Sequence, residues 1–274
     1  MDGTAKLWEV GSRKLVHTLP GHDTMVTSVA FHAGGKRLTT VTVDGTVVQW
    51  DPATGQRLRT WQGHLGPVQN TGFGVGFGAA GELLTTLVRD DTIRVWKTES
   101  GSEVARIPTD LPPHMAAFLS PDGKQVAAAT MGSVRLVEVK SGKAVAALPS
   151  SFHKVHHMAF SADGQRLAAA FWEGTVKIWD IKSRKLLHTF RHADRVTCVA
   201  FHPNGKQLAS GSCDNTAKVW DLETGQEVET LRGHIGYVMA LAYSSDGALL
   251  ATASGHRYAG EIQLWETAAF GKKR

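Results

Sequence analysis

The feature that most constrains this chain is a short segment that recurs seven times and ends, in six of its copies, on tryptophan. The final residues of these segments, called anchors below, are Trp8, Trp50, Trp96, Val137, Trp179, Trp220 and Trp265. Successive anchors are 42, 46, 41, 42, 41 and 45 residues apart. A period of this length indicates a repeat architecture, in which each copy is one small structural unit that stacks on its neighbours.

Each repeat has the pattern of four short strands separated by turn residues. Around Trp220, strand-like runs at 196–201, 207–212, 216–220 and 227–231 are divided by turns such as Asn204-Gly205 and Asp214-Asn215. Asn-Gly and Asp-Gly pairs favour tight hairpins. A sheet of four such strands has two apolar faces and is not stable alone, whereas radial stacking buries both. The sequence therefore predicts an all-β fold, a β-propeller of four-stranded antiparallel blades.

Two dipeptides recur in register with this period. Gly-His occurs at 21–22, 63–64 and 233–234, and Trp-Asp occurs at 50–51, 179–180 and 220–221. The chain resembles the WD-repeat (WD40) β-propeller family over essentially its whole length, and segments such as 51–56 and 223–226 resemble its bacterial members. The resemblance implies a non-catalytic scaffold for protein–protein interaction, such as the sensing or docking part of a bacterial signalling protein.

The positions of the repeats predict how one propeller domain would occupy residues 1–274. An N-terminal half blade covers 1–20, and six blades start near residues 22, 64, 110, 151, 192 and 234. We expect a seven-bladed ring with one incomplete blade. The alternative is a six-bladed ring in which residues 14–19 form the outer strand beside residues 261–265.

The family resemblance also implies a buried hydrogen-bond network in each blade, which links the Gly-His histidine, a Ser or Thr, the tight-turn Asp and the anchor. By position, one network consists of His22, Thr42, Asp44 and Trp50, and another of His192, Ser212, Asp214 and Trp220. The copy at Trp96 has Val88 at the hydroxyl position, and the copy at Trp179 has Phe171. Because these polar sets recur, we interpret them as structural and not catalytic, since an active site needs one asymmetric constellation.

Two sets of positions are expected to be exposed on one face of such a propeller, namely the residue before each tight-turn Asp and the residue that opens each first strand. The predicted partner-binding residues are Trp172, Arg89, Arg195, Tyr237, Tyr258, Arg257, Lys154 and Met25. Trp172 is favoured because Trp179 already occupies the anchor position of its repeat, and exposed aromatic and Arg residues dominate binding hot spots. The basic residues favour a protein or peptide partner that is acidic or phosphorylated.

Other function classes find little support in the sequence. Gly76–Gly81 matches a dinucleotide-binding pattern, but a strand-like run and not a helix follows it. His153, His156 and His157 suggest a metal cluster, but His156 and His157 would point to opposite sides of a strand and are poorly placed to share one ion. We therefore predict no catalytic residue, cofactor or metal, and keep a propeller enzyme (a hydrolase or lyase) and a nucleic-acid-binding propeller as alternatives.

Charge and composition bear on the compartment and on the nucleic-acid alternative. The formal charge of +5 is spread along the chain, which makes nucleic acid an unlikely partner. Apolar stretches are too short for a membrane span, no signal peptide is apparent, and Cys198 and Cys213 form no disulfide framework. These observations predict a cytoplasmic protein without membrane contact.

Overall fold

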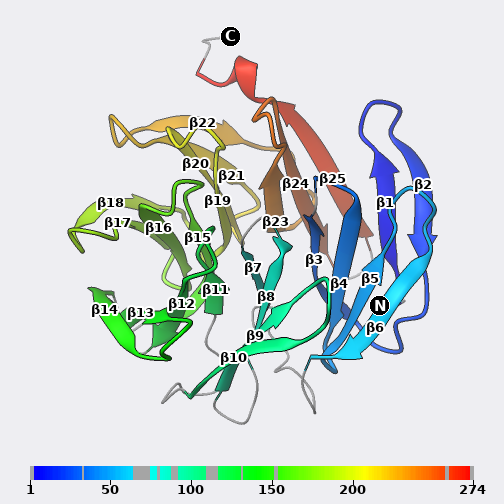
Figure 1. The fold of residues 1–274 in the computed structure, drawn as a ribbon. Helices are drawn as coiled ribbons and strands as arrows, with labels where there is room; N and C mark the ends of the chain where they lie inside the picture. Colours follow the sequence, from blue (N-terminus) through cyan, green and yellow to red (C-terminus); the bar gives the residue numbers. More distant parts are fainter. Residues whose placement is uncertain are drawn as a thin grey trace. The chain divides into compact units, whose positions relative to one another are not determined.

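The computed structural model describes residues 3–32, 34–63, 75–78, 81–87, 92–108, 117–130, 132–150, 154–256 and 259–271, and their regular structure is almost entirely β-strand (Figure 1). The chain divides into two compact units. The first comprises residues 1–130 with 135–145, and the second residues 131–134 with 146–274. In the described ranges no helix is long and apolar enough to cross a bilayer.

The first unit opens with a two-stranded sheet of β1 (Ala5–Glu9) and β2 (Lys14–Leu19). Two four-stranded sheets follow. One is formed by β3 (Val26–His32), β4 (Arg37–Thr42), β5 (Thr46–Trp50) and β6 (Arg57–Gln62), and the next by β7 (Val75–Gly78), β8 (Leu83–Leu87), β9 (Thr92–Lys97) and β10 (Glu103–Pro108). The strands of a further sheet are divided between the two units: β11 (Ala117–Leu119), β12 (Gln125–Thr130), β13 (Ser133–Glu138) and β14 (Ala144–Pro149).

The second unit continues the same pattern. One four-stranded sheet consists of β15 (Val155–Phe160), β16 (Arg166–Phe171), β17 (Thr175–Asp180) and β18 (Leu186–Arg191), and the next of β19 (Val196–Phe201), β20 (Gln207–Ser212), β21 (Ala217–Asp221) and β22 (Glu227–Leu231). The last sheet has three strands, β23 (Tyr237–Tyr243), β24 (Leu249–His256) and β25 (Ala259–Glu266), and the 3-10 turn Thr267–Ala269 follows it.

This arrangement confirms the predicted all-β fold of propeller blades, in which each sheet is an antiparallel meander in chain order. Among the described residues there are six sheets of three or four strands, which is the number in the six-bladed alternative, and β1–β2 form a separate two-stranded sheet. β2, which the six-bladed alternative placed beside residues 261–265, pairs with β1.

Apolar side chains between consecutive sheets explain why the repeats stack. In the second unit, Val176 and Ile178 of β17 pack together with Phe190, and this group meets Val199 and Leu208 of the following sheet. Alternate residues of a strand face the same side, so one short strand contributes two such side chains. Within each unit, consecutive sheets thus bury apolar faces against each other, as the repeat pattern predicts.

The tight turn between the second and third strands requires a left-handed backbone. Gly45, Gly174 and Asn215 occupy it with φ angles of 85°, 82° and 65°. Glycine adopts this conformation without steric cost and asparagine tolerates it. The recurring Gly or Asn before the third strand therefore has a local structural reason. The strand-like run predicted after Gly76–Gly81 is β8, which pairs with β7.

Candidate docking site

Trp172 lies in the tight turn between β16 and β17, where its side chain is 43% exposed. Its backbone N–H donates to the carbonyl of Lys154, the residue immediately before β15, at 2.9 Å. Cys213 donates to Arg195 in the next sheet with the same geometry. The two sets of positions predicted from the sequence therefore meet in pairs at the tight turns.

The first strands of neighbouring sheets in the second unit lie in matching register. The N–H of Val199 donates to Nδ1 of His157 at 3.5 Å, and the hydroxyl of Thr197 donates to the carbonyl of Val238. These contacts join residues 42 and 41 positions apart. Consecutive first strands are in contact with each other, and three of the predicted residues lie at the same end of these strands: Lys154 just before β15, Arg195 just before β19 and Tyr237 at the first position of β23.

Three side chains surround the exposed indole of Trp172. Lys154 Nζ lies 5.3 Å and Arg195 Cζ 5.1 Å from the ring, and the His156 ring lies 5.1 Å away at an interplanar angle of 36°. Cations at this distance interact favourably with an indole. We call Trp172, Lys154, Arg195 and His156 the Trp172 cluster. Sequence reasoning missed His156 as a member, although it follows Lys154 by two residues and such residues share one side of a strand.

The positive charge of the Trp172 cluster is carried by Lys154 and Arg195 and is available to a ligand. Burial lowers the pKa of His156 to about 4, and Lys154 and Arg195 act in the same direction, so this imidazole is neutral at pH 7. Burial also lowers the pKa of Lys154. Arg195 forms an ion pair with Asp194 at 3.5 Å, whereas Lys154 pairs with no carboxylate among the described residues. An exposed indole flanked by two cations is suited to bind an anionic group next to an apolar one.

The structure describes only some of the other predicted docking residues. Tyr237 opens β23 and is half exposed. Met25 belongs to the first unit, where its carbonyl accepts the N–H of Val43 at 2.9 Å in the same turn geometry. Three further residues lie outside the described part of the chain: Arg89, Arg257 and Tyr258. No group of three or more His, Cys, Asp or Glu side chains that could hold a metal occurs in the ranges that the structure describes.

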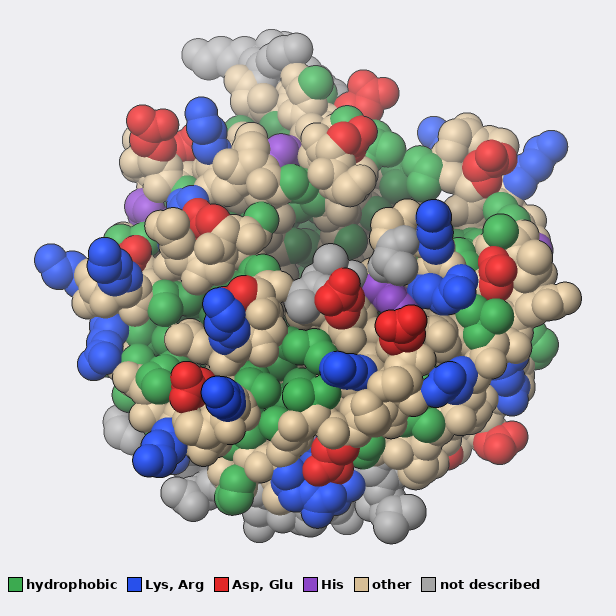
Figure 2. Space-filling view, viewed as in Figure 1, with side chains coloured by type: hydrophobic (Ala, Val, Ile, Leu, Met, Phe, Trp, Pro, Cys, Tyr) green, Lys and Arg blue, Asp and Glu red, His purple; other side chains and the backbone are tan. Residues whose placement is uncertain are grey.

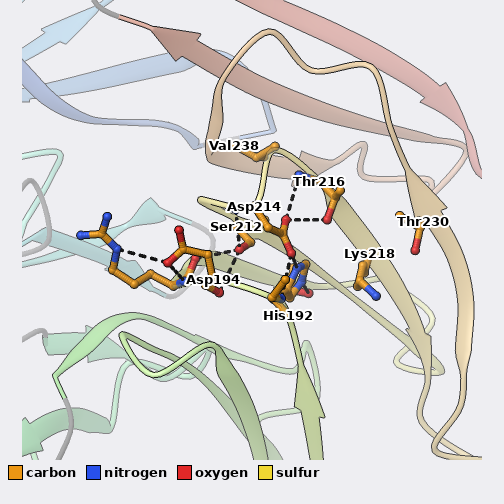
Figure 3. A network of polar contacts seen from close by, with 12 residues as sticks. His192, Asp194, Ser212, Asp214, Thr216, Lys218, Thr230 and Val238 are labelled. Carbon is orange, nitrogen blue, oxygen red and sulfur yellow. Dashed lines mark hydrogen bonds and ion pairs between the residues drawn. The ribbon is translucent and has the colours of Figure 1, made fainter.

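A buried polar network lies behind the tight turn of the β19–β22 sheet (Figure 3). His192 Nδ1 contacts Asp214 at 2.9 Å, and its Nε2 contacts the hydroxyl of Ser210 at 2.7 Å. The indole N–H of Trp220 donates to the same hydroxyl at 2.8 Å. Burial alone would raise the pKa of Asp214, but hydrogen bonds from His192 and Thr216 hold it below the ordinary range.

The prediction identified the histidine, aspartate and tryptophan of this network but chose the wrong bridging hydroxyl. Ser212 donates instead to the carbonyls of Asp194 and Arg195 and accepts the N–H of Asp214. Ser210 and Ser212 are two residues apart on β20 and share one face, so the sequence pattern does not distinguish them. The register decides, because Trp220 lies opposite Leu208 and its indole reaches the hydroxyl two residues further on.

The same correction applies in the first unit. Thr40, not Thr42, bridges His22 at 2.8 Å and the indole of Trp50 at 2.9 Å, while Thr42 bonds to Asp44. His22 Nδ1 contacts the carbonyl of Gly3 at 3.0 Å and not Asp44. Two other anchor indoles also donate to a hydroxyl on the second strand of their sheet. Trp96 donates to Thr86 and Trp265 donates to Thr252, both at 2.9 Å. The hydroxyl thought to be missing from the Trp96 repeat is therefore present.

Comparisons with known proteins agree with this architecture. A family model described as "WD domain, G-beta repeat" matches residues 13–51, 184–221 and 225–266, and one described as "Anaphase-promoting complex subunit 4 WD40 domain" matches residues 149–201. A nuclear distribution protein nudF of Aspergillus niger is 49% identical over 57 residues, which are 21% of this chain and 13% of that protein. A guanine nucleotide-binding protein subunit beta of Arabidopsis thaliana is 37% identical over 79 residues, 27% of this chain and 21% of that protein.

These matches are partial, since the chain aligns with only about an eighth to a fifth of the length of these relatives. A Retinoblastoma-binding-like protein E of Dictyostelium discoideum adds a match of 38% over 56 residues. The similar proteins thus come from fungi, a plant and an amoeba, and the resemblance to bacterial members expected from the sequence is not supported by them.

Proposed function

Because the chain is a WD40-repeat protein built from β-propeller blades, we propose that it is a non-catalytic scaffold that binds other proteins through the face carrying the Trp172 cluster. The observation that carries this proposal is the exposed indole of Trp172, which packs against Lys154 and Arg195 and fills no core position. Binding hot spots are enriched in Trp and Arg, and the exposed indole beside Arg195 has this composition.

The chemistry of the cluster favours an acidic or phosphorylated peptide as the partner. Arg195 offers a planar guanidinium and Lys154 an ammonium group, both of which bind carboxylate or phosphate, and Trp172 offers an apolar surface beside them. Elsewhere, basic and acidic side chains are interspersed over the visible surface of the sheets (Figure 2). This mixture does not favour nucleic acid, whose binding requires a continuous basic surface.

We place the protein in the cytoplasm. Both cysteines are free thiols, and burial raises the pKa of Cys198 to about 12, which keeps this thiol protonated and unreactive. Cys213, beside Arg195, also has a raised pKa because of burial. Two unpaired thiols suit a reducing compartment.

Fluorescence anisotropy with three labelled peptides tests the proposal. One peptide carries three glutamates, a second carries phosphoserines at the same positions, and a third carries glutamines. We expect the two anionic peptides to bind and the glutamine peptide to bind much more weakly. The ratio between the two anionic peptides distinguishes a carboxylate from a phosphate ligand. Added salt should weaken binding, because exposed charges are screened.

Three variants locate the binding site. Trp172→Ala should weaken binding about 30-fold, the size of a 2 kcal/mol hot spot, and Lys154→Ala and Arg195→Ala several-fold each. The matched controls are Leu187→Ala and Lys206→Ala, which change an exposed apolar and an exposed basic residue elsewhere in the second unit. Equal binding of the glutamine peptide, unchanged binding by Trp172→Ala, or tighter binding of single-stranded DNA than of any peptide would contradict the proposal.

A further inference from the structure

Asp194 immediately precedes Arg195, whose guanidinium lies beside the indole of Trp172. The carboxylate of Asp194 contacts Arg195 twice. Its Oδ1 accepts the backbone N–H of Arg195 at 2.7 Å and lies 3.5 Å from Nε of the guanidinium. The Asp194 side chain is 48% exposed. The candidate docking site therefore contains a carboxylate of its own, next to one of its two cations.

The backbone of Asp194 is held from two sides. Its carbonyl accepts the hydroxyl of Ser212 on β20 at 3.0 Å (Figure 3). Gly174, two residues after Trp172, packs against the same carbonyl, and a Cβ atom at Gly174 would lie 3.1 Å from its oxygen. The tight turn that carries Trp172 therefore lies directly against Asp194. Because Oδ1 is also bonded to the Arg195 N–H, the carboxylate has a fixed place beside the Trp172 cluster.

Two other carboxylates near the cluster are bonded to groups outside it. Glu173 lies 3.9 Å from the ammonium group of Lys177. Asp214 lies behind the next tight turn, where it contacts His192 and accepts the backbone N–H of Ala193. Asp194 differs from both, because it shares the exposed surface with a cation of the cluster. Its charge therefore acts directly on any anion that binds to Arg195.

The net charge of the site at pH 7 is small. Lys154 and Arg195 are positive, Asp194 is negative, and the imidazole of His156 is neutral. A bound carboxylate leaves such a site neutral, whereas a phosphate with a charge of about −2 leaves it negative. The cost of removing an ion from water grows with the square of its charge, but its attraction to the site grows only in proportion to that charge. A single excess positive charge therefore favours a carboxylate.

We propose that Asp194 is a specificity-determining residue, which makes the Trp172 cluster select a carboxylate side chain of the partner over a phosphorylated one. Asp194 makes this choice at the site of the proposed function, on which the inference rests. Lys154 and Arg195 attract both kinds of anion. Asp194 repels a phosphate about twice as strongly as a carboxylate, because the repulsion is proportional to the charge. The residue thus reduces the advantage that two cations alone would give to a phosphate.

Peptides with a single anionic position test the choice. Three labelled peptides of one neutral sequence, with leucine beside the central position, carry glutamate, phosphoserine or glutamine at that position. Fluorescence anisotropy measures their binding to the full chain. We expect the wild-type chain to bind the glutamate peptide about 3-fold more tightly than the phosphoserine peptide. Asp194→Asn keeps the oxygen that accepts the Arg195 N–H but removes the charge. It should tighten the glutamate peptide about 3-fold and the phosphoserine peptide about 10-fold, so that the preference for glutamate is lost.

Two further variants separate the local charge from other effects. Lys154→Met keeps the aliphatic stem beside Trp172, removes a positive charge and should weaken the phosphoserine peptide more than the glutamate peptide. The matched control Glu223→Gln changes the net charge as Asp194→Asn does, in the exposed turn between β21 and β22, and should leave both affinities unchanged. Tighter binding of the phosphoserine peptide by the wild-type chain, or a ratio of the two affinities that Asp194→Asn leaves unchanged, would overturn the role of Asp194 but not the proposed function. Equal binding of all three peptides would overturn both.

Discussion

The β15–β18 and β19–β22 sheets share one backbone arrangement but differ in their polar interiors. In the β19–β22 sheet, Ser210 joins His192 to the indole of Trp220. In the β15–β18 sheet, Ala169 occupies the register position of Ser210, and the indole of Trp179 donates to the carbonyl of Pro149 at 3.2 Å. Both tryptophans are nevertheless buried. Apolar packing therefore positions the anchor, and the polar network is an addition that one sheet has and its neighbour lacks.

If packing dominates, removing either anchor should have the same large effect. We expect Trp179→Ala and Trp220→Ala each to lower the free energy of unfolding by about 3–5 kcal/mol, because each leaves a large cavity in a core between sheets. Urea denaturation monitored by circular dichroism measures both. A loss below about 1 kcal/mol for Trp179→Ala, with a full loss for Trp220→Ala, would show that the polar network and not the packing positions the anchor.

The next largest loss of stability should come from removing the hydroxyl of Ser210, which the β15–β18 sheet lacks at this position. Ser210→Ala leaves both the imidazole of His192 and the indole N–H of Trp220 without their shared partner, so we expect a loss of about 2–3 kcal/mol. Ser212→Ala, the matched control on the same strand face, should cost about 1 kcal/mol, because its hydroxyl serves backbone groups at the turn. Equal losses from the two variants would mean that Ser210 contributes no more than Ser212, the residue to which the sequence pattern assigned the bridging role.

How far the sequence predicted these features depends on the kind of signal each one leaves. The strands and their order were predictable because seven copies of one pattern define the period. The exposure of Trp172 was predictable because Trp179 already occupies the core position of that repeat. The choice between Ser210 and Ser212 was not, since both lie on one face and only the register distinguishes them. The acceptor of Trp179 was also beyond prediction, because the carbonyl of Pro149 has no side-chain signal.

The pH dependence of the free energy of unfolding tests how much Asp214 stabilises the β19–β22 sheet. The pKa of its carboxyl is held below the ordinary range by hydrogen bonds from His192 and Thr216, despite burial. A depressed pKa in the folded state gives stability that is present above the unfolded value of about 3.9 and is lost as the pH falls further. Asp214→Asn should therefore cost about 1.5 kcal/mol at pH 7 and reduce the acid dependence of unfolding.

Urea titrations between neutral pH and about pH 3 measure that dependence. The matched control is Asp246→Asn, which removes a carboxylate hydrogen-bonded to Ser244 in an exposed turn and should change the slope less. An unchanged acid slope in Asp214→Asn would mean that the buried turn of the β19–β22 sheet does not depend on this charge.

The smallest expected difference involves two lysines at the same register position. Lys218 lies 5.4 Å from the Trp220 ring and 2.6 Å from Glu227, and Lys177 lies 5.2 Å from the Phe171 ring and 3.9 Å from Glu173. Replacing either with Met keeps the aliphatic stem and removes the charge, at a cost below about 1 kcal/mol. Lys218→Met should cost slightly more at low salt, because its ion pair is shorter, and the difference should shrink at high salt, where these partly exposed pairs are screened. A salt-independent difference would mean that the ring contact, and not the carboxylate, distinguishes the two lysines.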